Sequence, residues 1–419
     1  MCLSDGKSFR LTKYACYATN VSMAAISTIS PLLFVTFREM YGISYTLLGL
    51  LVVINFSTQL CVDLIFTLFS KYFNPRFAAL LTPVLTIAGL FIYAVLPGIF
   101  PDTAYLWLAV GTFVFSAASG LSEVLMSPIV AAIPADNPER EMSKLHSVYA
   151  WGLVGVVIFG AAFLHFAGDK NWQYLALIFA LIPMTALILF LVSPFPNMQM
   201  ATEKSEGGGF PPAIFLCVFC IFLGGAAECT MTQWISGYME NALGVPKLIG
   251  DVCGMAAFAF ALALGRSLYA ARGENILGVM TLGMAGAAVC YLLGALSGIS
   301  VIGLVACVLT GFCVSMLWPG NIILVGEKFP SAGVAAYALM AAGGDLGASV
   351  APQLLGIIAD GVGVSDFAQT LGQYFGMSAE QIGMRSGMLV SALFPLIGFV
   401  ITLIMKRKLS GGGSRDKRE

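Results

Sequence analysis

Twelve apolar stretches, separated by short polar loops, occupy nearly all of the 419 residues. A helix needs about 20 residues to cross a hydrocarbon layer roughly 30 Å thick, and the stretches reach that length. Only 10% of the residues are charged and 58% are hydrophobic, whereas soluble domains are about a quarter charged. Because a spanning segment must satisfy its own backbone polar groups, we expect an all-α integral membrane protein of twelve transmembrane helices. A soluble fold is excluded.

The predicted spans cover residues 11–37, 44–70, 76–97, 103–132, 142–167, 171–193, 211–240, 246–270, 274–297, 299–326, 331–359 and 379–405. The one long break between them, 194–210, contains Pro194, Pro196 and three consecutive glycines, which is typical of a linker. We therefore predict a six-helix bundle over 1–193 and a second over 211–409, followed by a disordered tail over 410–419. Glycines in the outer loop 361–378 predict an irregular cap.

The basic residues predict the orientation in the membrane. With the N-terminus inside, only Arg38, Lys170, Lys247 and Arg385 of the 21 Lys and Arg residues fall in outer positions. Both termini and the linker are therefore expected in the cytoplasm, in a multi-pass protein of the cell's inner (plasma) membrane. The remaining basic residues are spread along one face and form no patch for nucleic acid.

The division into six plus six spans is typical of two-bundle secondary transporters, whose binding residues lie near the membrane midplane between the halves. No nucleophile–base pair, phosphate-binding glycine loop or metal-ligand cluster stands out in the sequence. We therefore expect no enzyme activity and no cofactor.

Ionisable and polar residues inside a span are functional candidates because they are costly in lipid. In the N-terminal half, Asn55, Gln59 and Asp63 follow one another at four-residue spacing and share one helical face. They are expected either to line a solute cavity or to form a hydrogen-bonded helix seam. Glu123 has no basic residue within a helical turn, and an apolar setting would favour its protonated form. It is a candidate proton carrier, with a packed, protonated core residue as the alternative.

The C-terminal half carries a second group of candidates. Glu228, Gln233 and Trp234 combine a carboxylate, an amide and an indole, the groups that recognise polyhydroxylated solutes by hydrogen bonding and stacking. Asp345 lies among small residues and is a candidate proton or cation site, as is Asp63. Arg266 is interpreted as a gate or a helix-anchoring ion pair.

Four further residues complete the candidate solute contacts. His146 and Trp151 lie in the inner part of the fifth span, and Trp318 and Asn321 lie in the tenth. For His146 the alternative is a helix-start residue at the wet interface, and for Trp318 it is a place in the core.

Several short motifs resemble the Major Facilitator Superfamily, and within it the branch of bacterial L-fucose:proton symporters. Glu123 and Pro128 keep the spacing of that branch's E-x-x-x-N-P pattern in span 4, with Ser127 in place of Asn. The run from Phe222 to Glu228 is similar to its F-L-x-x-G-A-[QE] in span 7. The resemblance implies two six-helix bundles and a proton-coupling role for Glu123.

Other matches and departures qualify this resemblance. Gly265-Arg266 matches the branch's G-R, the segment Pro352 to Asp360 matches its P-x-x-x-G-x-x-[SA]-D, and His146 aligns with its span 5 Gln. The branch's span 1 Asp falls on Ser27, so one titratable partner is missing. The superfamily's signature between spans 2 and 3 is almost erased over 69–76.

The sequence therefore predicts a monomeric secondary active transporter that moves a small polar organic solute, with a sugar favoured, by proton symport and alternating access. Sodium coupling is left open. The alternatives are an exporter or facilitator of drugs or other metabolites with the same fold and, more remotely, a non-transporting membrane sensor.

Overall fold

The computed structural model of the chain describes residues 9–69, 72–135, 138–196, 211–273, 275–329 and 333–410. Within these ranges every regular element is helical, and twelve helical segments are long and apolar enough to cross a membrane. The predicted fold class and the number of spans are confirmed. Most of the predicted linker, 197–210, and nearly all of the predicted tail, 411–419, lie outside the described residues.

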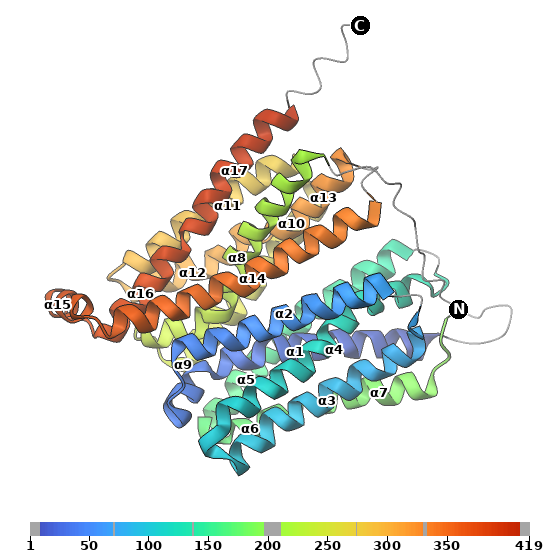
Figure 1. Cartoon of the computed structure of the whole chain (residues 1–419), viewed down its shortest axis with the longest axis horizontal. Helices are drawn as coiled ribbons and strands as arrows, with labels where there is room; N and C mark the ends of the chain where they lie inside the picture. Colours follow the sequence, from blue (N-terminus) through green and yellow to red (C-terminus); the bar gives the residue numbers. More distant parts are fainter. Residues whose placement is uncertain are drawn as a thin grey trace, which may run out of the picture. The chain divides into compact units, whose positions relative to one another are not determined.

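The first six spans are formed by α1 (Arg10–Tyr41), α2 (Tyr45–Phe69), α3 (Pro75–Ile99), η2 (Pro101–Thr103) with α4 (Ala104–Ala131), α5 (Pro138–Ala167), and η3 (Asp169–Asn171) with α6 (Trp172–Phe179) and α7 (Leu181–Val192). The last six are formed by α8 (Pro212–Asn241), α9 (Lys247–Ile249) with the π-helical η4 (Gly250–Ala256) and α10 (Ala257–Arg272), α11 (Ile276–Leu296), α12 (Ser300–Val314) with α13 (Leu317–Lys328), α14 (Gly333–Gly363), and α16 (Ala379–Ser391) with α17 (Leu393–Ser410). Figure 1 shows these helices coloured along the chain.

Local sequence explains where several helices begin and end. Asn74 accepts hydrogen bonds from the N–H groups of residues 76 and 77, and Pro75 fills the first helical position of α3. Ser378 and Gln381 form a reciprocal capping box at the start of α16. Gly42 ends α1 with φ +64°, a conformation that is cheap only for glycine.

The residues divide into two compact units. Unit 1 contains residues 1–43 and 54–202, and unit 2 contains residues 44–53 and 203–419. The first turns of α2 thus pack with unit 2, while the rest of that helix packs with unit 1.

Unit 1 is held together by a close crossing of α3 and α4 beside an aromatic cluster. A Cβ on Gly89 would lie 2.6 Å from the backbone nitrogen of Phe115, and one on Gly111 would lie 2.7 Å from the Tyr93 Cβ, so both positions need glycine. The Trp172 ring packs edge-on against Phe37 at 4.9 Å and against Tyr93 at 5.8 Å between ring centroids. Small residues and aromatic rings together fix this bundle.

In unit 2, α8 and α14 cross just as closely. A Cβ on Gly225 would lie 2.6 Å from the carbonyl oxygen of Gly344, and one on Gly347 would lie 3.0 Å from the backbone nitrogen of Ala226. Glycine at these positions brings the two backbones together and places Asp345 against α8.

The N-terminus of α2 is secured by α14. The carboxylate of Asp360 accepts hydrogen bonds from the N–H groups of Tyr45 at 3.1 Å and Thr46 at 2.6 Å. The next two N–H groups bond to the hydroxyl and carbonyl of Ser44. The N–H groups of Tyr45, Thr46 and Leu47, which have no intrahelical partner, are therefore all satisfied by side chains.

The outer loop predicted over 361–378 is more regular than expected. α14 continues to Gly363, and a separate helix, α15 (Asp366–Phe375), precedes α16. Its glycines occupy helix ends and a tight contact: Gly376 terminates α15 with φ +67°, and Gly372 lies against the carbonyl of Met377. Glycine content alone therefore gave the wrong expectation of an irregular cap.

Candidate functional site

The polar stripe of α2 lies against α4 within unit 1. Ser116 donates a hydrogen bond to Asn55 Oδ1 at 2.6 Å, and Gln59 donates one to Glu123 Oε2 at 2.5 Å. Between these two contacts, a Cβ on Gly120 would lie 2.8 Å from the carbonyl oxygen of Gln59 and 2.9 Å from Asp63 Oδ1. The structure thus brings the predicted stripe and Glu123 together along one helix–helix contact.

Glu123 differs from its expected surroundings. The sequence predicted a carboxyl alone in an apolar core, whereas its side chain is exposed in unit 1 and has the Gln59 amide as a partner. Gln59 offers both a donor and an acceptor, so it can bond a carboxylate through its NH₂ group and a protonated carboxyl through its oxygen. The pair therefore has a hydrogen-bonded arrangement for either protonation state.

His146 and Trp151 lie on an exposed part of α5. Trp151 is 66% exposed, and His146 is also exposed. The helix is fixed beside them by Asn20, which donates to the carbonyl of Leu145 at 3.0 Å. Both side chains are accessible to a solute.

In unit 2, Arg266 connects three helical segments. Its NH2 nitrogen donates to Glu228 Oε1 on α8 at 3.1 Å, and its Nε donates to the carbonyl oxygen of Ser315 at 3.1 Å. Ser315 and Met316 form the break between α12 and α13. Arg266 thus links α8 and α10 to the interruption of the tenth span.

The break in the tenth span follows from Pro319. In a continuous helix the N–H of residue 319 would bond to the carbonyl of residue 315, but proline has no N–H. The freed carbonyl of Ser315 is satisfied by the Arg266 guanidinium instead. Gly265 permits this approach, because a Cβ there would lie 2.8 Å from that of Ser315.

Glu228 and Arg266 leave hydrogen-bonding capacity for a ligand. Glu228 Oε2 is buried and has no hydrogen-bond partner among the described residues. The side chain of Arg266 is 40% exposed, and that of Glu228 is 16% exposed. The pair therefore presents an acceptor without a partner next to accessible guanidinium donors, a combination that suits a hydroxylated or otherwise polar solute.

Asp345 is a second acidic group near this pair. It is 3% exposed, and Cys229 lies within electrostatic range of Asp345, Glu228 and Arg266 together. The indole of Trp318 covers Gly344, where a Cβ would lie 2.5 Å from the ring, and it also contacts Gly225. Asp345 and Glu228 thus both lie within electrostatic range of Cys229, and Trp318 packs on Gly344, the residue before Asp345.

The other predicted residues of unit 2 are placed in the interior. Trp234 is fully buried, and its indole N–H donates to the carbonyl of Pro352 at 2.9 Å. Gln233 is 5% exposed. Asn321 is fully buried and donates to the carbonyl of Leu317 at 2.7 Å. In this structure Trp234 packs between helices, whereas Trp318 packs on Gly225 and Gly344.

Asp251 is a buried acid that sequence reasoning missed. It is 1% exposed on the π-helical turn η4, accepts a hydrogen bond from Ser236, and forms an ion pair with Lys247 at 3.4 Å. The sequence did indicate Asp251 as a candidate, because it is the only acidic residue within the predicted span 246–270.

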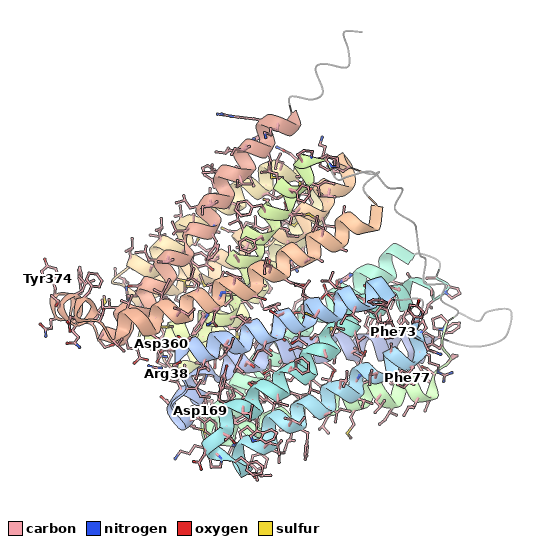
Figure 2. All side chains as sticks on the ribbon, in the orientation of Figure 1. Arg38, Phe73, Phe77, Asp169, Asp360 and Tyr374 are labelled. Carbon is pink, nitrogen blue, oxygen red and sulfur yellow. The ribbon has the colours of Figure 1, made fainter. Side chains whose placement is uncertain are left out.

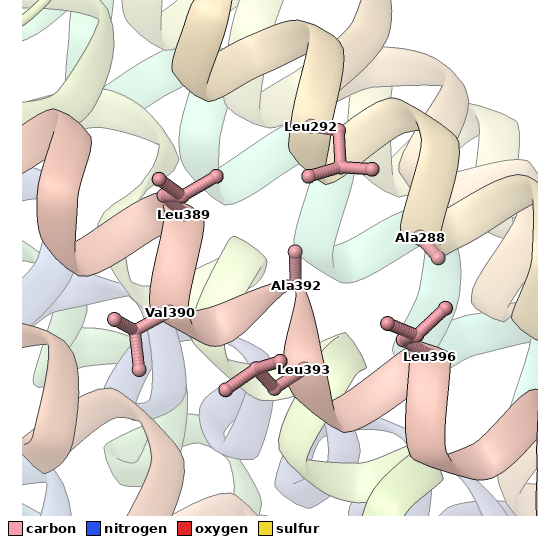
Figure 3. Close-up of a pocket in the computed structure, with 7 residues that line it drawn as sticks. All are labelled: Ala288, Leu292, Leu389, Val390, Ala392, Leu393 and Leu396. Atoms are coloured by element: carbon pink, nitrogen blue, oxygen red, sulfur yellow. The ribbon is translucent and has the colours of Figure 1, made fainter.

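A pocket between α11 and the α16–α17 break has a different character. It is lined only by apolar side chains, including Ala288, Leu292, Leu389 and Leu396, as Figure 3 shows. Such a lining offers no hydrogen bonds to a polar solute, so we place the candidate site at Glu228 and Arg266 instead.

These features define the class of the protein: a polytopic α-helical membrane protein with six spans in each half of its sequence, broken helices, and paired polar groups inside its spans. The chain belongs to the Major Facilitator Superfamily, whose sequence model matches residues 15–352. It is a transporter and not an enzyme. No curated protein matches the chain.

Solved structures with the same fold have distant sequences. A bacterial homologue of the human lysosomal transporter Spinster, in an inward-facing and occupied conformation, has a TM-score of 0.75 and 14% identity, covering 94% of this chain and 96% of its own. A D-xylose–proton symporter has a TM-score of 0.67 and 15% identity, covering 92% and 96%. A mutant of the E. coli fucose:proton symporter has a TM-score of 0.56 and 14% identity, covering 95% and 99%. At these identities the likeness concerns the fold alone.

Proposed function

We propose that this transporter moves a small polar organic solute, with a sugar favoured, by proton symport. The single observation that carries the proposal is the Glu228–Arg266 pair at the break in the tenth span. Discontinuous helices are the usual place for binding sites in secondary transporters, because interrupted backbone is tolerated where it borders a cavity. Glu228 Oε2 accepts a solute hydroxyl, Arg266 holds Glu228 in place, and Trp318 offers an apolar face for stacking.

Proton coupling is assigned to Glu123. Its exposed carboxyl can exchange a proton, and Gln59 can bond to both protonation states. Asp345 is the second candidate for binding a coupling ion, because it is a buried carboxyl within a membrane span. Alternating access exposes these groups to each side of the membrane in turn. The transporter is proposed to act as a monomer in the inner (plasma) membrane, with both termini in the cytoplasm.

Two measurements on the purified protein test this function. The first is thermal stabilisation by a panel of sugars, sugar acids and lipophilic cations, since a ligand that binds only the folded state raises its stability. Stabilisation by sugars supports the proposal, whereas stabilisation by lipophilic cations alone would favour a drug exporter of the same fold.

The second measurement is uptake of the stabilising solute into proteoliposomes under separately imposed pH and Na⁺ gradients. Uptake driven by the pH gradient alone is expected. Uptake driven by Na⁺ at zero pH gradient, lost in Asp345→Asn and kept in Glu123→Gln, would replace the proton with sodium and leave the solute assignment intact.

A further inference from the structure

The short helix α15 has an apolar face that is largely exposed. Four side chains, at the spacing of one helical stripe, form this face: Phe367, Leu371, Tyr374 and Phe375. The three aromatic residues are 62%, 83% and 57% exposed in chain order. We call these four residues the aromatic face.

The rest of α15 shows that this face is not the packing side of the helix. Ala368 and Gly372 are the buried residues, and Gly372 lies against Met377 and Ser378 in the chain that leads into α16. A third side of the helix carries four exposed polar residues: Asp366, Gln369, Thr370 and Gln373. α15 is thus amphipathic in three sectors: one packed on the protein, one polar, and one apolar and open.

The position of α15 in the chain limits what can cover the aromatic face. It is joined on one side to the membrane span that ends at Gly363 and on the other to the span that begins at Ala379. Three residue steps of at most about 3.6 Å each keep its start within roughly 11 Å of the first of these span ends. The headgroup layer on each side of a bilayer is about 5–8 Å thick, so α15 is held at or next to that layer. Figure 1 shows α15 beyond the ends of α14 and α16, and Tyr374 lies at the tip of unit 2 in Figure 2.

We propose that the aromatic face of α15 lies in the interfacial layer of the bilayer, so that this helix anchors the outer loop of unit 2 to lipid. Aromatic side chains are enriched at this level of membrane proteins, and amphipathic helices lie there with their apolar face toward the acyl chains. Asp366 is the only charged residue between 361 and 378, which favours zwitterionic headgroups over an electrostatic attraction to anionic lipid.

Anchoring α15 to lipid would also affect the contacts that hold the start of α2. α15 connects Asp360, which binds the N–H groups of Tyr45 and Thr46, to Glu380, which accepts a hydrogen bond from the Tyr45 hydroxyl at 2.6 Å. Both residues that hold the start of α2 therefore lie within six residues of an end of α15. Lipid contact on α15 restrains the two segments that carry them.

Photo-crosslinking of the full-length protein in phosphatidylcholine vesicles tests the proposal. A benzophenone amino acid replaces Tyr374 on the aromatic face or, as a matched control, the adjacent Gln373 on the polar face. After irradiation, the mass of the protein reports the partner. We expect several times more lipid adduct at position 374 than at position 373.

Equal lipid adducts at the two positions would overturn the proposal, as would a covalent dimer at position 374, which would assign the face to a second copy of the chain. Replacing Phe367, with Gln369 as its control, repeats the comparison about two turns earlier in the helix if the Tyr374 variant does not fold. None of these outcomes depends on the transported solute.

Discussion

The Gln59 amide donates a 2.5 Å hydrogen bond to the Glu123 carboxyl, and this contact joins the polar stripe of α2 to α4. In the sequence the two residues are separated by more than a whole span. Gln59 is a neutral partner for Glu123. Its amide can bond to the ionised or to the protonated carboxyl, and it adds no charge beside it. A basic partner would instead hold the carboxyl in its ionised form.

Glu123→Gln is expected to abolish solute accumulation driven by a pH gradient while preserving counterflow, which needs no net proton movement. The amide keeps the shape and one hydrogen bond to Gln59 but cannot carry a proton. Uptake into proteoliposomes and exchange of labelled solute measure the two activities. If a pH gradient drives as much solute accumulation in this variant as in the wild type, Glu123 has no part in the coupling mechanism.

The order of the membrane spans along the chain was predictable because each span is a long run of apolar residues that can be recognised without knowing its neighbours. The shared face of Asn55, Gln59 and Asp63 was predictable from their spacing alone. The partner of that face was not, because spacing along one helix does not say which other helix packs against it. The contact with α4 needs Gly120, whose lack of a side chain lets the helices approach.

The Glu228–Arg266 contact shows the same limit. Both residues were candidates, but the sequence assigned them to separate roles, as a solute ligand and as a gate or helix-anchoring ion pair. The same Arg266 side chain bonds to the carbonyl of Ser315, which Pro319 leaves without a helical N–H partner. Pro319 was therefore the sequence feature that could have indicated this contact. Trp234 was a candidate solute contact because of its chemistry, and its side chain is fully buried in this structure.

A double-mutant cycle on Glu228→Gln and Arg266→Gln is expected to give a coupling of about 0.5–3 kcal/mol in the binding of the stabilising solute. Each single change breaks the ion pair and leaves the remaining partner poorly satisfied, so the double change should cost less than the sum. Calorimetric titration measures the four affinities. Additive losses would mean that the two residues act on the solute independently.

Asp360→Ala should lower the free energy of unfolding by about 0.5–2 kcal/mol, the usual cost of losing a helix N-terminal cap. Two N–H groups of α2 lose their acceptor in this variant. Asp360→Asn is the matched control, because an amide oxygen still accepts a hydrogen bond and the melting temperature should fall less. Equal melting temperatures for the alanine variant and the wild type would show that water replaces the carboxylate at no cost.

The final prediction concerns the pH dependence of stability at the start of α5. Hydrogen bonds and charge from Lys13 and Lys144, at 2.6 and 2.9 Å, lower the pKa of Glu141 to about 2. Because the folded-state pKa lies below that of the unfolded chain, these contacts stabilise the protein fully above about pH 4.3 and lose their effect as the pH falls toward 2.

Glu141→Gln should therefore melt at a lower temperature than the wild type at pH 7, and the difference should shrink steadily below about pH 4.3 as the wild-type carboxyl takes up its proton. Melting curves in detergent across this range measure the effect. Glu380→Gln is a suitable control, because the carboxyl of Glu380 accepts its hydrogen bond from a neutral tyrosine hydroxyl. A difference for Glu141→Gln that stays constant from neutral to acid pH would show that the lost contact is one of packing and shape instead of charge.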